Sequence, residues 1–331
     1  MPSQPRQIIA NQLYELEIRT RSGLPFVCLL LVRLLLASAM ARTQRDFKVI
    51  ITHFLWMGNH LHLLFVAKDA EQAMRFYSEL MKKITDYYKR LFALPRLELW
   101  EPNGAVLSRV LDVESAKDRI AYLFSNPSKA NLVDSITDYP GFSSWDSFSK
   151  ANADEAVTEP VPWIRQPSIP PLPQSSLTER QDRFITGKLI SEAQTAHNLT
   201  VHAGAAFAVF GIKEKAELAS IGESIQREIA RREEEYRRDR FKNGSKVLGK
   251  NALRRESLRK AHTPKREATD RKVLFHTTIK QLATEFLAQF DAFCNKCREA
   301  YRAHRAGHSH AHWPPGAFRP PMGPLANAIA L

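Results

Sequence analysis

The chain has 331 residues, of which 44% are hydrophobic, so it can bury a sizeable core and hold more than one domain. Its net charge of +13 favours nucleic acid as the partner over an anionic membrane, because the basic residues do not flank one amphipathic segment. Only three cysteines, Cys28, Cys294 and Cys297, argue against a disulfide framework and favour a reducing compartment.

The first elements in chain order are a strand, a helix and a strand pair. Residues 13–19 alternate apolar and charged side chains, which predicts a strand. Residues 25–42 predict a buried helix. The central Arg33 and the polar residues before this run argue against a signal peptide or membrane anchor. Residues 48–56 are rich in β-branched and aromatic side chains, and a Gly-Asn turn leads from them into a further strand at His60.

Two helices and one strand follow. Apolar residues recur at helical spacing over 70–94, and this helix has a basic outer face. Residues 106–111 predict a strand, and 114–126 predict a helix that Pro127 stops. This order of elements predicts an α+β fold, a ferredoxin-like antiparallel sheet with helices on one face.

The second half of the chain differs in composition. Residues 151–180 are rich in proline and predict an extended linker or a strap over the surface, and residues 181–331 predict a mainly helical, basic domain. Its predicted helices span 178–198, 213–242 and 273–307. Residues 237–266 hold twelve Lys and Arg against two acids, which favours contact with DNA phosphates. The basic residues expected to make these contacts are Arg254, Arg255, Arg259, Lys260, Lys265 and Arg266.

Four residues of the first 150 suggest chemistry. His60 and His62 are two apart on a predicted strand, so both imidazoles point to the same face, as in half of a metal site. Tyr122 and Asn126 are four apart on a predicted helix and share one of its faces. Either histidine or the tyrosine alone would more often be a packed core residue, so the combination carries the hypothesis.

The His-Leu-His stretch after Gly58-Asn59, with Tyr122 followed at Asn126-Pro127 by an amide and a proline, resembles the single-tyrosine HUH endonucleases. The resemblance is in particular to the REP-associated tyrosine transposases and their insertion-sequence relatives, over about residues 10–150. The resemblance implies that His60, His62 and Asn126 bind Mg²⁺ or Mn²⁺ and that Tyr122 is the nucleophile. It also implies that the predicted sheet is the palm of that family and that residues 1–150 are the catalytic domain.

The same resemblance implies a metal-dependent endonuclease and strand transferase of single-stranded DNA. It would act at hairpin-forming repeats through a 5′-phosphotyrosine intermediate. The implied partners are single-stranded or hairpin DNA and, in some relatives, a second copy of the chain, so a homodimer and a monomer both stay open. The expected location is the cytoplasm, with the nucleoid.

Departures from the family pattern leave alternatives open. The family usually has proline where Gly58 stands, and it carries a basic residue shortly after the tryptophan at position 100, where this chain reads Glu-Pro-Asn-Gly. The loss of that basic residue allows a second function, a non-catalytic DNA-binding protein derived from a transposase. A third is a replication initiator or relaxase of the same chemistry. Tyr87 and Tyr88 are rival nucleophiles without the Asn-Pro context.

A zinc site is a further alternative in the last quarter of the chain. Cys294 and Cys297 are followed by four histidines, His304, His308, His310 and His312. Their spacing does not fit a usual zinc finger, and the cysteines continue an apolar helical pattern. Two buried thiols beside a solvated histidine-rich turn are therefore favoured.

Overall fold

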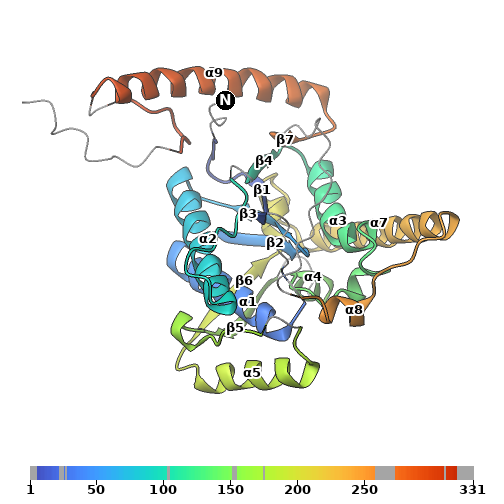
Figure 1. The fold of residues 1–331 in the computed structure, drawn as a ribbon. Helices are drawn as coiled ribbons and strands as arrows, with labels where there is room; N and C mark the ends of the chain where they lie inside the picture. The colour runs from blue at the N-terminus through green and yellow to red at the C-terminus, as the bar shows by residue number, and fades with distance from the viewer. Residues whose placement is uncertain are drawn as a thin grey trace, which may run out of the picture.

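A mixed sheet runs through the computed structural model (Figure 1), which describes residues 6–21, 26, 28–102, 105–150, 155–173, 176–257, 273–308 and 311–318. The strands follow each other in the order β5-β6-β2-β3-β1-β4-β7. Their bounds are β1 Leu13–Arg19, β2 Ile50–Trp56, β3 His60–Val66, β4 Val106–Val110, β5 Ala156–Pro162, β6 Ala196–His202 and β7 Phe275–His276.

The four central strands form the predicted palm. They pair antiparallel in the order β2-β3-β1-β4, which is the ferredoxin-like arrangement. Three helices connect or follow them: α1 (Leu30–Phe47), α2 (Ala70–Phe92) and α3 (Val113–Lys129). The α+β fold class and all four predicted palm strands are therefore confirmed, and the structure shifts their ends by no more than two residues.

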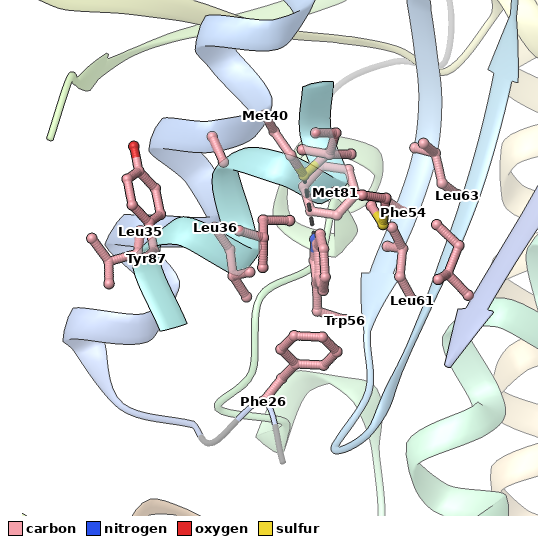
Figure 2. Close-up of a cluster of buried hydrophobic side chains, with 14 of the residues drawn as sticks. Phe26, Leu35, Leu36, Met40, Phe54, Trp56, Leu61, Leu63, Met81 and Tyr87 are labelled. Carbon is pink, nitrogen blue, oxygen red and sulfur yellow. Dashed lines mark hydrogen bonds between the residues drawn. The ribbon is translucent and has the colours of Figure 1, made fainter. Parts of the chain in front are cut away.

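Helices α1 and α2 cover one face of the palm, as predicted. Alternate residues of the strands point into this cluster, in which Trp56 packs against Phe26 and lies near Met40 and Leu61 (Figure 2). The indole Nε1 of Trp56 contacts the Met40 sulfur at 3.3 Å. Burying these large side chains on one face fixes the register of the strands, since a shift of one residue would turn every side chain over.

The opposite face of the palm is covered as well. Here α3 packs on the sheet with α6 (Ala205–Ala208) and the long helix α7 (Lys215–Lys242), which lies along α3 and extends beyond it (Figure 1). The second apolar cluster includes Leu55 and Leu64 from the strands and Phe124 from α3. The sequence predicted helices on one face of the sheet, whereas the structure has helices on both faces. Helices α6 and α7, from the residues after 200, supply much of the second layer.

Helix α1 begins at Leu30, five residues later than predicted. The side chain of Asp182 on α5 (Glu179–Glu192) accepts hydrogen bonds from the backbone N–H groups of Leu30 and Leu31, at 2.7 and 3.0 Å. These are among the donors that a helix N-terminus leaves without intrahelical partners. A cap from a residue 150 positions away leaves no local signal in the sequence.

Helix α3 does not end at Asn126, so the prediction that Pro127 stops it is wrong by one turn. Pro127 lies inside the last turn of the helix, which continues to Lys129. Arg240 of α7 donates to the Ser128 carbonyl and to the Asp134 carboxylate, both at 2.7 Å. It thereby supplies a hydrogen-bond donor to one of the last carbonyl groups of α3, which have no partner within the helix. Asn126 is therefore a helical residue, held in register with Tyr122.

The segment predicted as a linker contains a strand. Residues 156–162 form β5, which pairs antiparallel with β6, and β6 pairs with β2 of the palm at Val201. The predicted helix over 178–198 is wrong at its end, because α5 stops at Glu192 and residues 196–202 form β6. The division into domains at 150 and 180 stays a prediction, although the sheet takes strands from all three parts.

The last described elements lie at the other edge of the sheet. β7 pairs in parallel with β4, and α9 (Lys280–Arg305) follows it across the top of Figure 1. Short α8 (Lys250–Arg254) and α4 (Trp145–Lys150) pack near the α3 side. In the described part of the chain, no helix combines the length and apolarity that crossing a membrane requires.

Candidate active site

The two histidines of the motif lie on β3 and face α3. His60 and His62 alternate with Leu61 and Leu63, which point to the α1 side. The two imidazole rings are 4.9 Å apart between centroids. His62 is buried and His60 is half-buried, so the pair is reached from the His60 side.

Hydrogen bonds fix the same tautomer in both rings. His60 Nδ1 lies 2.8 Å from Asn59 Oδ1, and His62 Nδ1 lies 3.0 Å from Glu15 Oε1. A carbonyl or carboxylate oxygen only accepts, so each Nδ1 donates and Nε2 is the nitrogen left for a ligand. Burial, the neighbouring His62 and Arg19 hold the pKa of His60 well below its usual range, which keeps this imidazole neutral.

Helix α3 brings Tyr122 and Asn126 to the same place. Asn126 Nδ2 lies 3.1 Å from His62 Nε2, and the Tyr122 ring meets the His62 ring edge-on at 6.0 Å between centroids. Asn126 is buried and Tyr122 is half-buried. His62 thus contacts both Asn126 and Tyr122 on α3, and His60 lies on its other side.

Two cations lie against the ring of Tyr122. The Arg119 guanidinium lies 4.3 Å and the Lys129 ammonium 4.8 Å from the ring centroid. Burial raises the pKa of the Tyr122 hydroxyl, Arg119 opposes this, and the carboxylates of Glu17 and Glu15 raise it further. The phenol is therefore protonated at neutral pH, and it needs activation to act as a nucleophile.

Glu15 on β1 joins the parts of the site. Arg119 donates to it twice, from Nε to Oε2 and from an Nη to Oε1, both at 2.8 Å, and His276 Nε2 of β7 lies 3.1 Å from Oε2. Burial opposes ionisation of Glu15. Hydrogen bonds with His276 and His62 and the charge of Arg119 outweigh it and hold the carboxyl pKa well below its usual value. One carboxylate thus orients a histidine and the arginine beside Tyr122.

The residues present fit a divalent metal ion. Two imidazoles that engage their Nδ1 atoms in hydrogen bonds, with the His62 Nε2 directed at Asn126, and one amide are ligands for such an ion, and a carboxylate behind a histidine ligand is the usual support. Asn126 would present its oxygen after a half-turn of the amide, whose two orientations differ little in shape. Among the described residues, no cluster of three or more His, Cys, Asp or Glu side chains is arranged for a metal, so the amide is needed to complete the set.

The rival tyrosines lie elsewhere. Tyr87 and Tyr88 are buried on α2, in the apolar cluster on the other face of the sheet. Tyr87 donates its hydroxyl hydrogen bond to the Ile164 carbonyl at 2.8 Å, and burial raises the pKa of both phenols. Trp100, at the departure from the family pattern, donates from Nε1 to Thr85 Oγ1 at 2.9 Å and is a packing residue here.

The predicted DNA-binding residues are only partly described. Arg254 ends α8 and Arg255 follows it as an exposed residue, while Arg259, Lys260, Lys265 and Arg266 lie outside the described residues. Cys294 and Cys297 are free thiols on α9, buried with Phe286, Phe290 and Phe293. Their role in binding zinc stays untested.

Sequence reasoning missed the residues behind the motif. Glu15 is one of the charged residues of an alternating strand, and nothing in that pattern indicates that its side chain is buried. Arg119, three residues before Tyr122, shares a helix face with it and could have been found from that spacing. His276 comes from a strand of two residues more than 200 positions from the motif, and nothing local in the sequence points to it.

No protein-family model matches the chain, and no curated protein is similar to it at a significant level. Among solved structures, the chain is similar to a REP-associated tyrosine transposase bound to a REP hairpin. The identity is 18% and the TM-score 0.39, and the match covers 45% of this chain and 86% of the other. At this identity and TM-score, the likeness does not show that the chain belongs to the family.

Proposed function

We propose that the protein is a metal-dependent, single-tyrosine endonuclease and strand transferase of single-stranded DNA, acting at hairpin-forming sequences. One observation carries this proposal. Tyr122 and Asn126, one turn apart on α3, meet the His60–His62 pair on one face of the sheet. A phenol beside a set of metal-binding side chains is what nucleophilic cleavage of a phosphodiester needs.

The chain's own residues have separable roles in this reaction. His60, His62 and Asn126 would hold Mg²⁺ or Mn²⁺, and the ion would stabilise the charge that develops on the scissile phosphate. The Tyr122 oxygen attacks the phosphorus, forms the tyrosyl ester of the 5′-phosphate and releases a 3′-hydroxyl. The phenol loses one proton and the leaving oxygen gains one. Rejoining reverses the same exchange with another 3′-hydroxyl, so strand transfer requires no further energy source.

Arg119 and Lys129 favour the charged intermediates of this step. Both cations lie within 5 Å of the centre of the Tyr122 ring, where they stabilise a phenolate. Arg119 also has its guanidinium fixed by the two hydrogen bonds to Glu15, so it does not have to reorganise when charge develops. Helix α7 supports the same helix through Arg232, which bonds the Asp118 carboxylate.

A second function, a non-catalytic DNA-binding protein derived from a transposase, is favoured by one observation. The pKa of Tyr122 is raised, which keeps the nucleophile protonated unless something activates it. The two functions differ in their dependence on metal. A binder holds DNA through phosphate contacts, with an affinity that depends on salt and is indifferent to Mn²⁺.

A cleavage assay with Mn²⁺ separates the two functions. Labelled hairpin oligonucleotides are incubated with the protein, with Mn²⁺ or with EDTA, and run on a denaturing gel that retains protein–DNA adducts. We expect a covalent adduct with Mn²⁺ and none with EDTA. Binding that is equal in both conditions, with no adduct across a library of hairpins, would replace the nuclease by the binding protein.

A further inference from the structure

A second group of cations lies on the other side of the molecule from Tyr122. Arg42 and Arg45 lie near the end of α1, on the face of the sheet away from α3. Trp163 follows β5 directly and Arg165 comes two residues later, while His197 lies at the adjacent end of β6. These five residues are called the α1–β6 cluster below. Nothing local in the sequence groups them, because they come from three separate segments.

The three guanidiniums of the α1–β6 cluster lie against the rings of Trp163 and His197. The guanidinium carbons of Arg42 and Arg165 lie 4.7 and 5.2 Å from the Trp163 ring centroid. His197 lies against the same indole at 5.6 Å between centroids. Arg42 lies 3.2 Å and Arg45 3.4 Å from His197 Nε2. An arginine donates, so His197 Nε2 is the acceptor and the imidazole is neutral.

This arrangement leaves positive charge concentrated at one spot. Asp46 contacts Arg42 and Arg45, at 3.2 and 2.7 Å. One carboxylate and a neutral imidazole do not neutralise the three guanidiniums of the cluster, which include Arg165. Burial, together with the charges of Arg45 and Arg42, lowers the pKa of His197. Like charges held together around a neutral ring repel each other, and an oxyanion placed between them would relieve that repulsion. Stacking on Trp163 fixes guanidinium planes, as bidentate binding of phosphate requires.

We propose that Arg42, Arg45 and Arg165 form a binding subsite for a backbone phosphate of single-stranded nucleic acid, with Trp163 and His197 as the platform that orients them. The subsite lies on the opposite side of the sheet from Tyr122, so it would hold a stretch of strand away from the scissile phosphate. This proposal rests on the proposed function in one respect, namely that the bound partner is a nucleic acid.

The surroundings favour a polymer over a small anion. Lys83 on α2 is close enough to lower the pKa of Asp46, and Arg90 of the same helix donates to the Pro167 carbonyl at 3.2 Å. Lys83 pairs with Glu79 at 3.4 Å, so Arg90 is the cation of α2 that adds positive charge beside the α1–β6 cluster. A row of cations matches the repeating charge of a nucleic-acid backbone, whereas an isolated phosphate would use one end of it.

Binding of a fluorescein-labelled single-stranded oligodeoxynucleotide tests the subsite. All variants carry Tyr122→Phe, so that cleavage does not enter the measurement. The test variant adds Arg45→Gln and Arg165→Gln, both at exposed side chains, and its urea unfolding is compared with that of the control. The control adds Arg183→Gln and Arg298→Gln, two exposed arginines of α5 and α9 that lie outside the cluster and off α2, and it removes the same charge.

We expect the test variant to bind several-fold more weakly than the control at moderate salt. Its slope of log affinity against log salt should be shallower by about 1.4, the value for two lost contacts with single-strand phosphates. Equal losses in the test and control variants would mean a general charge effect and would overturn the subsite. Because no cleavage is measured, an absent covalent adduct in the wild type would count against the nuclease alone.

The pKa of His197, followed by NMR of labelled histidine and assigned with His197→Gln, gives a second measurement. A phosphate bound between Arg42 and Arg45 stabilises the imidazolium, so the oligonucleotide should raise this pKa. A pKa that the oligonucleotide leaves unchanged would overturn the proposal. A rise with inorganic phosphate but none with the oligonucleotide would also overturn it, because the cluster would then be a site for small anions.

Discussion

Replacing Tyr122 with phenylalanine is expected to abolish the covalent protein–DNA adduct while leaving folding and DNA binding unchanged. The substitution removes the one oxygen that attacks phosphorus and keeps the ring. The ring retains its edge contact with His62 and its cation–π contacts with Arg119 and Lys129. The adduct is measured on the denaturing gel, and binding is measured in parallel by fluorescence anisotropy.

The matched control is Tyr236→Phe. The Tyr236 phenol on α7 is close enough to Tyr122 to raise its pKa, so it is the neighbouring hydroxyl most able to substitute for it. We expect this variant to keep the adduct. An adduct that survives Tyr122→Phe and disappears in Tyr236→Phe would move the nucleophile from α3 to α7 and refute the assignment.

Replacing Glu15 with glutamine should have the largest effect on stability. Glutamine keeps the shape of the side chain but removes the charge that balances Arg119, and it offers one acceptor oxygen where His62, His276 and Arg119 used two. Breaking a buried ion pair from one side costs roughly 3 to 5 kcal/mol in the free energy of unfolding. Loss of support for a histidine ligand lowers metal affinity by about 10- to 100-fold.

Urea unfolding and Mn²⁺ titration calorimetry measure these two effects. Glu17→Gln is the control, since Glu17 lies two residues along the same face of β1, is more exposed and pairs with Arg19 at 2.7 Å. We expect it to change stability by less than about 1 kcal/mol. Glu15→Asp keeps the charge and is used if Glu15→Gln does not fold. Mn²⁺ affinity that equals the wild type in both Glu15 variants would refute the role of Glu15 behind His62.

The palm could be predicted from sequence because its signals are local. Three signals each depend on neighbouring residues: the alternation over residues 13–19, the Gly-Asn turn and the apolar periodicity of α2. The structure has the predicted strands and helix at these places. The errors lie where residues distant in sequence determine the end of a helix or the formation of a strand. The start of α1 depends on Asp182, the end of α3 depends on Arg240, and β6 forms only because β2 and β5 lie on either side of it.

The site shows the same division. The placement of the motif residues could be predicted, because a strand period of two puts His60 with His62 and a helix period near four puts Tyr122 with Asn126. Their roles as metal ligands and nucleophile came from the family resemblance and stay a proposal. The residues that hold the motif side chains in place could not be predicted. Glu15 resembles any polar residue of an alternating strand until its burial is known, and His276, which contacts it, lies far away in the sequence. The α1–β6 cluster is hidden for the same reason.

The central claim is that His60, His62 and Asn126 hold a divalent metal beside Tyr122, and pulsed EPR of the Mn²⁺-loaded protein tests it most directly. Nitrogen couplings from two imidazoles are predicted in the wild type, reduced to one in His60→Gln and in His62→Gln. They should be unchanged in His197→Gln, which alters a histidine of the α1–β6 cluster. Bound Mn²⁺ without nitrogen couplings, or with couplings that both β3 variants leave intact, would contradict the account.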